Sequence, residues 1–167
     1  IDHTTDNNLV TMRFRLKDVP MTAAEEDFEA GGKKFRAGGF IIANANASQV
    51  GAVLTDLGLT GTAMSAMPTV KQHNLDIPRI GYVHSWQRTQ DEGWVRAAFD
   101  TYGVPYTYFS DQKLREGNLR AKYDVIIFPH VGGTATSQVQ GIAMTGKTPV
   151  PYKKSAETPN LGGIDET

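Results

Sequence analysis

The segment PRIGYVHSWQRTQDEGWVRAAFDTYGVPYTYFSDQKLREGNLRAKYDVIIFPH, Pro78–His130, decides the fold. Its short apolar runs RIGYVH, YTYF and YDVIIF are rich in β-branched and aromatic residues, and they predict three strands. Between the first two runs, Asp91–Tyr102 has the apolar period of a helix. Strands that alternate with helices indicate βαβ units and a parallel sheet. We therefore expect an α/β fold in which this segment forms a βαβαβ unit.

The boundaries of this unit carry clear end signals. Gly103 stands where the C-cap of the first helix belongs, and Pro105 follows it. Ser110 is a suitable N-cap for a short helix over Asp111–Glu116. The last run, Tyr123–Phe128, is almost entirely apolar, which is typical of a strand covered on both faces. The inward face predicted for the first helix consists of Trp94, Val95, Ala98, Phe99 and Tyr102.

The first 70 residues predict a smaller α+β lobe, joined by the connector Lys71–Pro78 to a domain that spans residues 78–167. Leu9–Lys17 alternates apolar and polar residues, as a half-buried strand does. The other elements that we expect in this lobe are a helix over Thr22–Ala30, a strand over Phe40–Ala43, a helix capped by Asn46 or Ser48 and ending near Leu57, and a strand over Thr60–Met67.

Composition excludes several classes of function. With 17 Lys and Arg against 18 Asp and Glu, the chain is almost neutral, which argues against a nucleic-acid binder with a broad basic face. No apolar run approaches the ~20 residues that a membrane-spanning helix needs. The absence of cysteine excludes disulfides, thiolate metal sites and a cysteine nucleophile within this chain.

The two ends of the chain read as the ends of a fragment. It begins at Ile1 without a leader-like segment and stops at Thr167 in a polar stretch with no closing helix or strand. We interpret the α/β domain as incomplete at its carboxyl end. An incomplete sheet leaves an open edge, through which two copies of the chain could pair.

Two histidines, His84 and His130, each end a predicted strand of the parallel unit. In the common 2-1-3 strand order these strands are neighbours, and their carboxyl ends flank the point at which open α/β sheets bind ligands. Trp86 and Glu92 belong to the loop and helix start beside them. We expect a ligand site formed by these four residues. The alternative is structural: histidines at strand ends often cap backbone groups, and Glu92 favours the helix dipole.

Other candidate chemistry is weaker. His3 with Asp6 and His73 with Asp76 share an H-x-x-D spacing that could place an imidazole and a carboxylate on one helical turn. Neither pair has an evident third ligand, so surface histidines are the alternative reading. No G-x-S-x-G nucleophile elbow occurs. We expect no catalytic residue, no metal ligand and no cofactor-binding residue within the chain.

Three stretches carry a family resemblance: SWQRTQDEGWVRAAFDTYGVPYTY, LREGNLRAKYDVIIFPH and PYKKSAETPNLGG. Together they resemble the region downstream of the peptidase domain in bacterial zinc carboxypeptidases of the carboxypeptidase A type. That region is similar to a class I glutamine-amidotransferase-like domain, so the resemblance implies a flavodoxin-like or amidotransferase-like sheet. The preceding stretches TDNNLVTMRFRLKD and AGGFIIANA resemble the lobe that links the two domains.

The resemblance implies a parent protein but no activity for this chain. The peptidase of that family holds zinc through H-x-x-E and a distant third histidine, and the chain has no H-x-x-E. The amidotransferase-like half normally uses a cysteine nucleophile, which is also absent. The resemblance therefore implies zinc in the parent peptidase domain only, with that domain as the partner of this chain. It also implies an exported protein, periplasmic or extracellular.

Two functional hypotheses follow. The first is a non-catalytic accessory region of a zinc carboxypeptidase, which positions the peptidase or binds a peptide or glycan end at the carboxyl edge of the sheet. The second is a small-molecule-binding or hydrolytic α/β domain that has its own site at the carboxyl ends of its strands.

Overall fold

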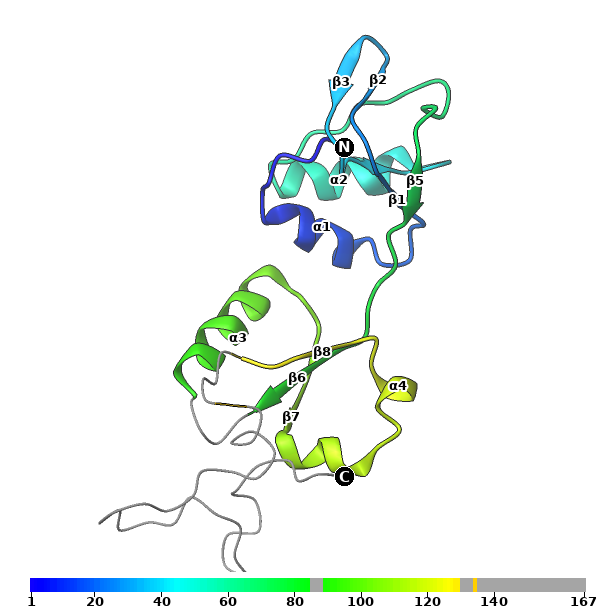
Figure 1. Cartoon of the computed structure of the whole chain (residues 1–167). Coiled ribbons are helices and arrows are strands. Elements are labelled where there is room, and N and C mark those ends of the chain that lie inside the picture. The colour runs from blue at the N-terminus through cyan, green and yellow to red at the C-terminus, as the bar shows by residue number, and fades with distance from the viewer. Residues whose placement is uncertain (85–88, 130–133, 135–167) are drawn as a thin grey trace, which may run out of the picture. The chain divides into compact units, whose positions relative to one another are not determined.

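The computed structural model of the protein describes residues 1–84, 89–129 and 134. The chain divides into two compact units, drawn in Figure 1. The first unit comprises Ile1–Ile77 together with Tyr102–Val104, and the second contains the rest of the chain from Pro78 onward. Helices, small antiparallel sheets and a parallel sheet are all present, which confirms the predicted α/β class.

The longest stretch without a helix or strand between two elements of the described residues joins α2 to β5 and spans residues 57–71. Up to Ile77 they are α1 (Asn8–Arg15), β1 (Thr22–Ala24), β2 (Phe28–Ala30), β3 (Lys33–Phe35), β4 (Phe40–Ile41), α2 (Ala47–Asp56) and β5 (Gln72–Asn74). From Pro78 they are β6 (Ile80–His84), α3 (Gln90–Tyr102), β7 (Thr107–Ser110), the 3₁₀ helix η1 (Asp111–Glu116), α4 (Leu119–Lys122) and β8 (Val125–Ile127).

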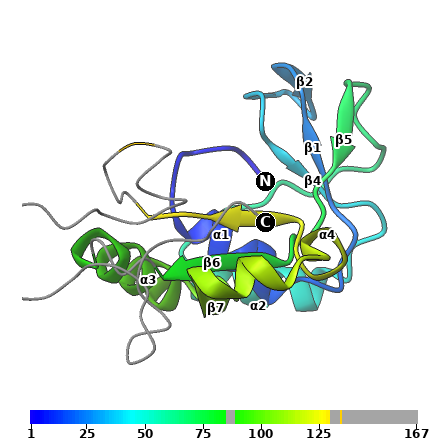
Figure 2. The same ribbon diagram turned by 60° about the horizontal axis from the view of Figure 1, so that its bottom comes forward.

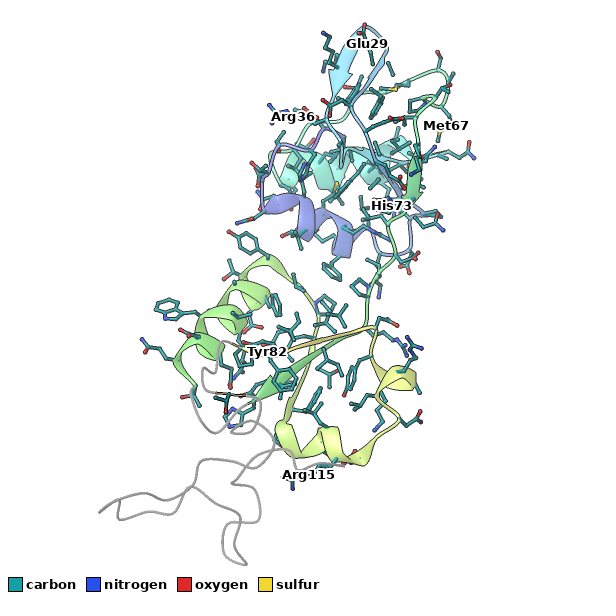
Figure 3. All side chains as sticks on the ribbon, viewed as in Figure 1. Glu29, Arg36, Met67, His73, Tyr82 and Arg115 are labelled. Carbon is teal, nitrogen blue, oxygen red and sulfur yellow. The ribbon has the colours of Figure 1, made fainter. Side chains whose placement is uncertain are left out.

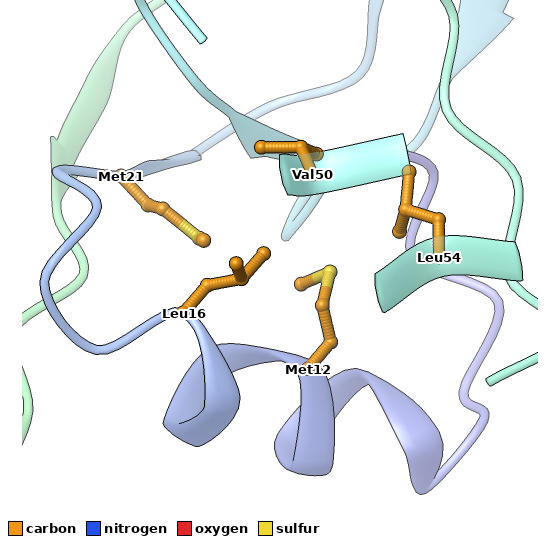
Figure 4. Close-up of a cluster of buried hydrophobic side chains, with 5 residues drawn as sticks. All are labelled: Met12, Leu16, Met21, Val50 and Leu54. Carbon is orange, nitrogen blue, oxygen red and sulfur yellow. The ribbon is translucent and has the colours of Figure 1, made fainter. Parts of the chain in front are cut away.

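The first unit combines two helices with two small antiparallel sheets. One sheet has the order β4-β1-β5 and the other is the β2-β3 hairpin; Figure 2 shows β1 and β5 side by side. Strand β5 lies in the stretch predicted to be a connector. The helices enclose the core of this unit, which Figure 4 shows in close-up. Its members are Met12, Leu16, Met21, Val50 and Leu54.

The strand predicted over Leu9–Lys17 is wrong, because this segment forms helix α1. Its buried side chains are Leu9, Met12, Arg13 and Leu16, which have helical rather than alternating spacing. Val10, which the alternating pattern places inside, is 43% exposed. The stretch satisfies both periods, and packing of α1 against α2 favours the helix.

Two further predictions in this unit are wrong. Thr22–Ala30 contains β1 and β2 instead of a helix, because Thr22–Ala24 pairs with strands distant in sequence on both sides. Thr60–Met67 contains no strand. Pairing partners of this kind depend on the tertiary structure and leave little trace in a local pattern.

The helix predicted after Asn46 is confirmed. The Asn46 side chain accepts a hydrogen bond from Gln49 N at 3.1 Å, which makes it the N-cap and decides against Ser48. Val50 and Leu54 are buried, as predicted. Gly58 follows the helix with φ +67°, a conformation that favours glycine.

In the second unit three parallel strands form a sheet of order β7-β6-β8. This is the predicted 2-1-3 order. His84 pairs with Ser110 in register on one side of β6, and Tyr82 pairs with Ile127 on the other. In Figure 1, α3 and α4 lie on opposite sides of these strands. Tyr82, labelled in Figure 3, is fully buried and packs edge-on against Phe99 of α3.

Helix α3 has the predicted position, but its inward face is rotated. Trp94 is 72% exposed, and Ala98 is also exposed, so both residues were placed wrongly. Glu92 is buried, while Arg96 and Phe99 are half-buried. These three residues share one helix face by spacing, and they meet a sheet face rich in tyrosine hydroxyls. Polar partners on the sheet therefore determine which helix face turns inward.

The last strand is less covered than predicted. Val125 and Phe128 are 42% and 43% exposed, so the described residues do not cover β8 on both faces.

The cap predicted for the short helix η1 is present only by position. Ser110 occupies the N-cap position of η1 but makes no side-chain capping bond.

The start of β8 is fixed by Asp124, whose carboxylate accepts hydrogen bonds from Arg79 N and Nε at 2.8 and 3.0 Å. These bonds lower the pKa of Asp124 to about 2.

Candidate functional site

The predicted site residues that the structure describes meet at the carboxyl end of the central strand. β6 ends at His84, between β7 and β8. Strand β7 follows β6 in the chain on one side, and the chain then returns to place β8 on the other side. This reversal is the topological switch point at which open α/β sheets bind ligands.

A buried carboxylate lies at this strand end. Glu92, in the first turn of α3, is only 4% exposed. Its Oε2 lies 2.8 Å from His84 Nδ1, and its Oε1 accepts a hydrogen bond from the hydroxyl of Tyr108. Burial of an unpaired carboxylate costs several kcal/mol, so these two partners are what allow Glu92 to lie inside.

His84, Glu92 and Tyr108 form one cluster of contacts. The Tyr108 hydroxyl lies 3.1 Å from His84 Nδ1 as well, so imidazole, carboxylate and phenol contact one another pairwise. The Tyr108 hydroxyl donates to Glu92, and the other carboxylate oxygen contacts the imidazole. Glu92 therefore links the phenol and the imidazole and limits the movement of both side chains.

Tyrosines and one arginine surround this cluster. Tyr82 donates its hydroxyl to the carbonyl oxygen of Glu92 at 3.3 Å, and its ring stacks against Tyr108 at a centroid distance of 6.3 Å. The guanidinium carbon of Arg96 lies 4.1 Å from the centroid of the Tyr108 ring, which is a cation–π contact. Arg96 Nε also donates to the Tyr106 hydroxyl at 3.4 Å.

The environment of Tyr108 disfavours its ionisation. Burial, followed by the hydrogen bond to Glu92 and the charge of that carboxylate, raises the pKa of Tyr108 to about 12. Burial and the same carboxylate also raise the pKa of Tyr82. Both phenols therefore remain protonated throughout the neutral range, and Tyr108 stays a hydrogen-bond donor to Glu92.

A pH dependence follows from the raised pKa of Tyr108. The unfolded chain ionises this phenol near pH 10, whereas the folded chain retains its proton up to about pH 12. The resulting stabilisation is complete below pH 10 and is lost as the pH rises to 12. It would reach ~2.7 kcal/mol for a fully buried group. Because Tyr108 is 39% exposed, we expect about 1 kcal/mol after solvent screening.

The comparison of wild type with Tyr108→Phe measures this contribution. Urea unfolding at a series of pH values should show the stability advantage of the wild type over Tyr108→Phe narrowing by about 1 kcal/mol between pH 9 and 12. The other ionisable groups are common to both proteins and cancel in the difference. An advantage that stays constant over this range would contradict the proposed hydrogen bond from Tyr108 to Glu92.

The structure brings together two of the four predicted site residues. His84 and Glu92 are in contact, whereas Trp86 and His130 lie outside the described residues. Sequence reasoning missed Tyr108 and Arg96. A signal was present for each: Tyr108 lies two residues before the end of β7, on the strand face that also carries Tyr106. Arg96 follows Glu92 by four residues, which places both on one helix face.

The two H-x-x-D pairs of the first unit do not form imidazole–carboxylate contacts of their own. His73 Nδ1 lies 3.4 Å from Glu25 rather than on Asp76, and Asp6 accepts a hydrogen bond from Asn8 N at 2.8 Å. His3, Asp6 and His73 line one cavity of about 390 Å³. Among the described residues, no group of three or more His, Asp or Glu side chains is arranged to hold a metal ion.

Comparisons with protein-family models, with curated proteins and with solved structures give no match for this chain. Within the described part of the chain, none of the helices has the length and apolar character that crossing a membrane requires. The case for function therefore depends on the contacts at the end of β6 and on the resemblance carried by the sequence.

Proposed function

We propose that the chain is a non-catalytic accessory region of an exported bacterial zinc carboxypeptidase, and that its second unit binds a ligand at the carboxyl end of its parallel sheet. The observation that carries the ligand site is the buried carboxylate of Glu92, held by His84 and Tyr108 at this strand end. Charged groups are seldom buried without a reason, and those with specific partners in such a position often serve binding.

The parentage is supported by the three long stretches that resemble the region downstream of the peptidase domain. The accessory role is supported by what the whole sequence lacks: it has no H-x-x-E zinc motif and no cysteine. A region without these groups contributes to a peptidase by packing on it or by holding part of its substrate. A peptide or glycan end is the ligand class we propose for the second unit.

Peptidase assays test the non-catalytic role. The purified chain, supplied with Zn²⁺ and a peptide such as hippuryl-phenylalanine, should release no C-terminal residue above the rate of a zinc-only blank. The gene that encodes the chain should also encode an H-x-x-E zinc domain upstream of Ile1. Zinc-dependent release of phenylalanine that His84→Ala abolishes would show that the chain is itself catalytic, contrary to the proposal.

Ligand binding is tested separately by ¹⁵N NMR titration. The probes are a peptide with a free C-terminus, acetyl-Ala-Ala-Phe, and a glycan end, diacetylchitobiose. We expect at least one of them to shift the amide signals of His84, Glu92 and Gly93 in the wild type, and we expect His84→Ala to abolish the effect. If neither probe moves these signals, the ligand site at the end of β6 is wrong.

A hydrolytic role is the second candidate, and one observation favours it. The 2.8 Å contact between His84 Nδ1 and Glu92 is the pairing of base and orienting carboxylate found in catalytic triads. A nucleophile is the missing part, because the sequence contains no G-x-S-x-G elbow. Turnover of p-nitrophenyl acetate that His84→Ala and Glu92→Gln both abolish would favour hydrolysis over simple binding.

A further inference from the structure

Glu92 and Arg96 differ in how far their side chains are already engaged within the protein. Both carboxylate oxygens of Glu92 are engaged, by His84 and by Tyr108, and the side chain is buried. Both of its oxygens therefore already have partners within the protein. Arg96 lies one helical turn further along α3.

Arg96 has no carboxylate partner in the part of the chain that the structure describes. The spacing of Glu92 and Arg96 favours an ion pair on a helix surface, but Glu92 is bound to His84 and Tyr108 instead. Arg96 contacts the Tyr108 ring face and the Tyr106 hydroxyl. Asp100 is reached only through Tyr106, which donates to it at 3.0 Å. Among the described residues, this half-buried guanidinium is therefore held by aromatic groups and has no carboxylate as its counter-ion.

These contacts also hold the guanidinium in place. The Tyr108 ring limits its movement on one side, and the bond to Tyr106 engages Nε. The two terminal amino groups of a guanidinium form a rigid planar fork. Such a fork matches the two oxygens of a carboxylate and binds them in a bidentate manner. His84 contacts the same tyrosine, because its Nδ1 lies 3.1 Å from the Tyr108 hydroxyl.

We propose that the ligand of the second unit carries a carboxylate and that Arg96 is the residue that binds it, so that the site accepts the free C-terminus of a peptide. This inference rests on the proposed function, because it concerns the same strand end. It selects the peptide end over the glycan end. It also assigns Glu92 a positioning role: by engaging His84 and Tyr108, Glu92 leaves Arg96 available to the ligand.

The test compares acetyl-Ala-Ala-Phe with its C-terminal amide and with inorganic phosphate, each titrated into the ¹⁵N-labelled chain. We expect the free acid to shift the amides of Glu92–Arg96 and Tyr106–Tyr108, and the amide to bind at least 10-fold more weakly. Arg96→Gln should cause a similar loss for the acid, and Arg96→Lys a smaller one, because lysine keeps the charge but not the fork.

A matched control is Arg36→Gln, at an exposed arginine of the first unit that Figure 3 labels, and it should bind the acid as the wild type does. Both Arg96 variants are first checked for a native ¹⁵N spectrum, and Arg96→Lys keeps the test valid if Arg96→Gln unfolds. Equal binding of acid and amide, or full binding by Arg96→Gln, would overturn the inference.

The remaining outcomes separate this inference from the proposed function. If phosphate binds as tightly as the peptide acid, Arg96 is a site for phosphoryl anions and the carboxylate assignment is wrong. If only diacetylchitobiose binds at the end of β6, the proposed ligand site stands and the carboxylate inference falls. If no probe affects this strand end, the ligand site itself is wrong.

Discussion

Replacement of Glu92 by alanine should lower the free energy of unfolding of the second unit by about 3 kcal/mol. The substitution leaves a void at a position that is 4% exposed. It also removes the carboxylate that contacts His84 and accepts the hydrogen bond of Tyr108. Leaving a buried polar group without its partner typically costs about 1–3 kcal/mol, and two groups lose a partner here. We expect a loss in the lower part of the summed range because His84 and Tyr108 can reach solvent when Glu92 is absent.

Tryptophan fluorescence during urea unfolding measures this effect in the relevant unit. Trp86 and Trp94 are the only tryptophans of the chain, and both belong to the second unit. With an m-value of roughly 1.5 kcal/mol/M, the midpoint of Glu92→Ala should be about 2 M lower in urea than that of the wild type. Glu92→Gln keeps the volume and one acceptor, so about half of this loss is expected.

Asp91→Asn is the matched control for Glu92. Asp91 is the preceding residue, it is also acidic and lies in the first turn of α3, but it is exposed. Its contribution is limited to the helix dipole, and we expect a loss of at most about 0.5 kcal/mol. Equal losses for Asp91→Asn and Glu92→Gln would mean that only the helix dipole is involved and that the contacts of Glu92 add nothing.

The sequence predicts the elements whose determinants are local. Asn46 caps α2. The three apolar runs of the second unit form β6, β7 and β8 along the chain, and these strands have the expected order β7-β6-β8 in the sheet. Each of these depends on a capping side chain or on a run of strand-forming residues close together in the chain. Such signals act within one element, so a single sequence is enough to detect them.

The elements predicted wrongly are those that distant residues decide. α1 was expected to be a strand because Leu9–Lys17 alternates, yet Met12 and Leu16 pack on Val50 and Leu54 of α2, which requires the helical period. The same stretch of sequence supports either structure in isolation. The contact with α2 determines the outcome, and the periodicity of the segment itself carries no information about it.

At the site, too, local signals were predictable from the sequence, whereas contacts between distant residues were not. The end of β6 was located at His84 from the sequence, and the expected topology brought His84 and Glu92 into one hypothesis. Tyr108 was missed because aromatic residues in strands usually fill the core. Its hydroxyl becomes a partner of Glu92 only through the register that pairs Tyr82 with Tyr108. Strand register depends on how two segments pair, so the sequence of β7 alone could not reveal it.

Gly81→Ala should destabilise the second unit by about 2–3 kcal/mol without affecting the ligand site. A Cβ at Gly81 would lie 2.8 Å from Phe109 Cε1 and 3.1 Å from the Tyr123 ring. These two rings are stacked with centroids 5.1 Å apart, and Phe109 is buried, so neither ring can move away freely. Overpacking of this kind in a core typically costs 1–3 kcal/mol.

Gly81 lies on the sheet face opposite the proposed ligand site, so Gly81→Ala separates the stability of the second unit from ligand binding. Successive residues of a strand point to opposite faces, so Gly81 faces away from Tyr82, α3 and the Glu92 cluster. The variant should therefore lose stability while retaining the carboxylate binding proposed for Arg96.

Gly93→Ala is the matched substitution on α3, where nothing lies within 4 Å of the added Cβ. It should stabilise the second unit by about 0.5–1 kcal/mol. If Gly81→Ala is as stable as Gly93→Ala in urea unfolding, then the stacked pair of Phe109 and Tyr123 does not cover β6.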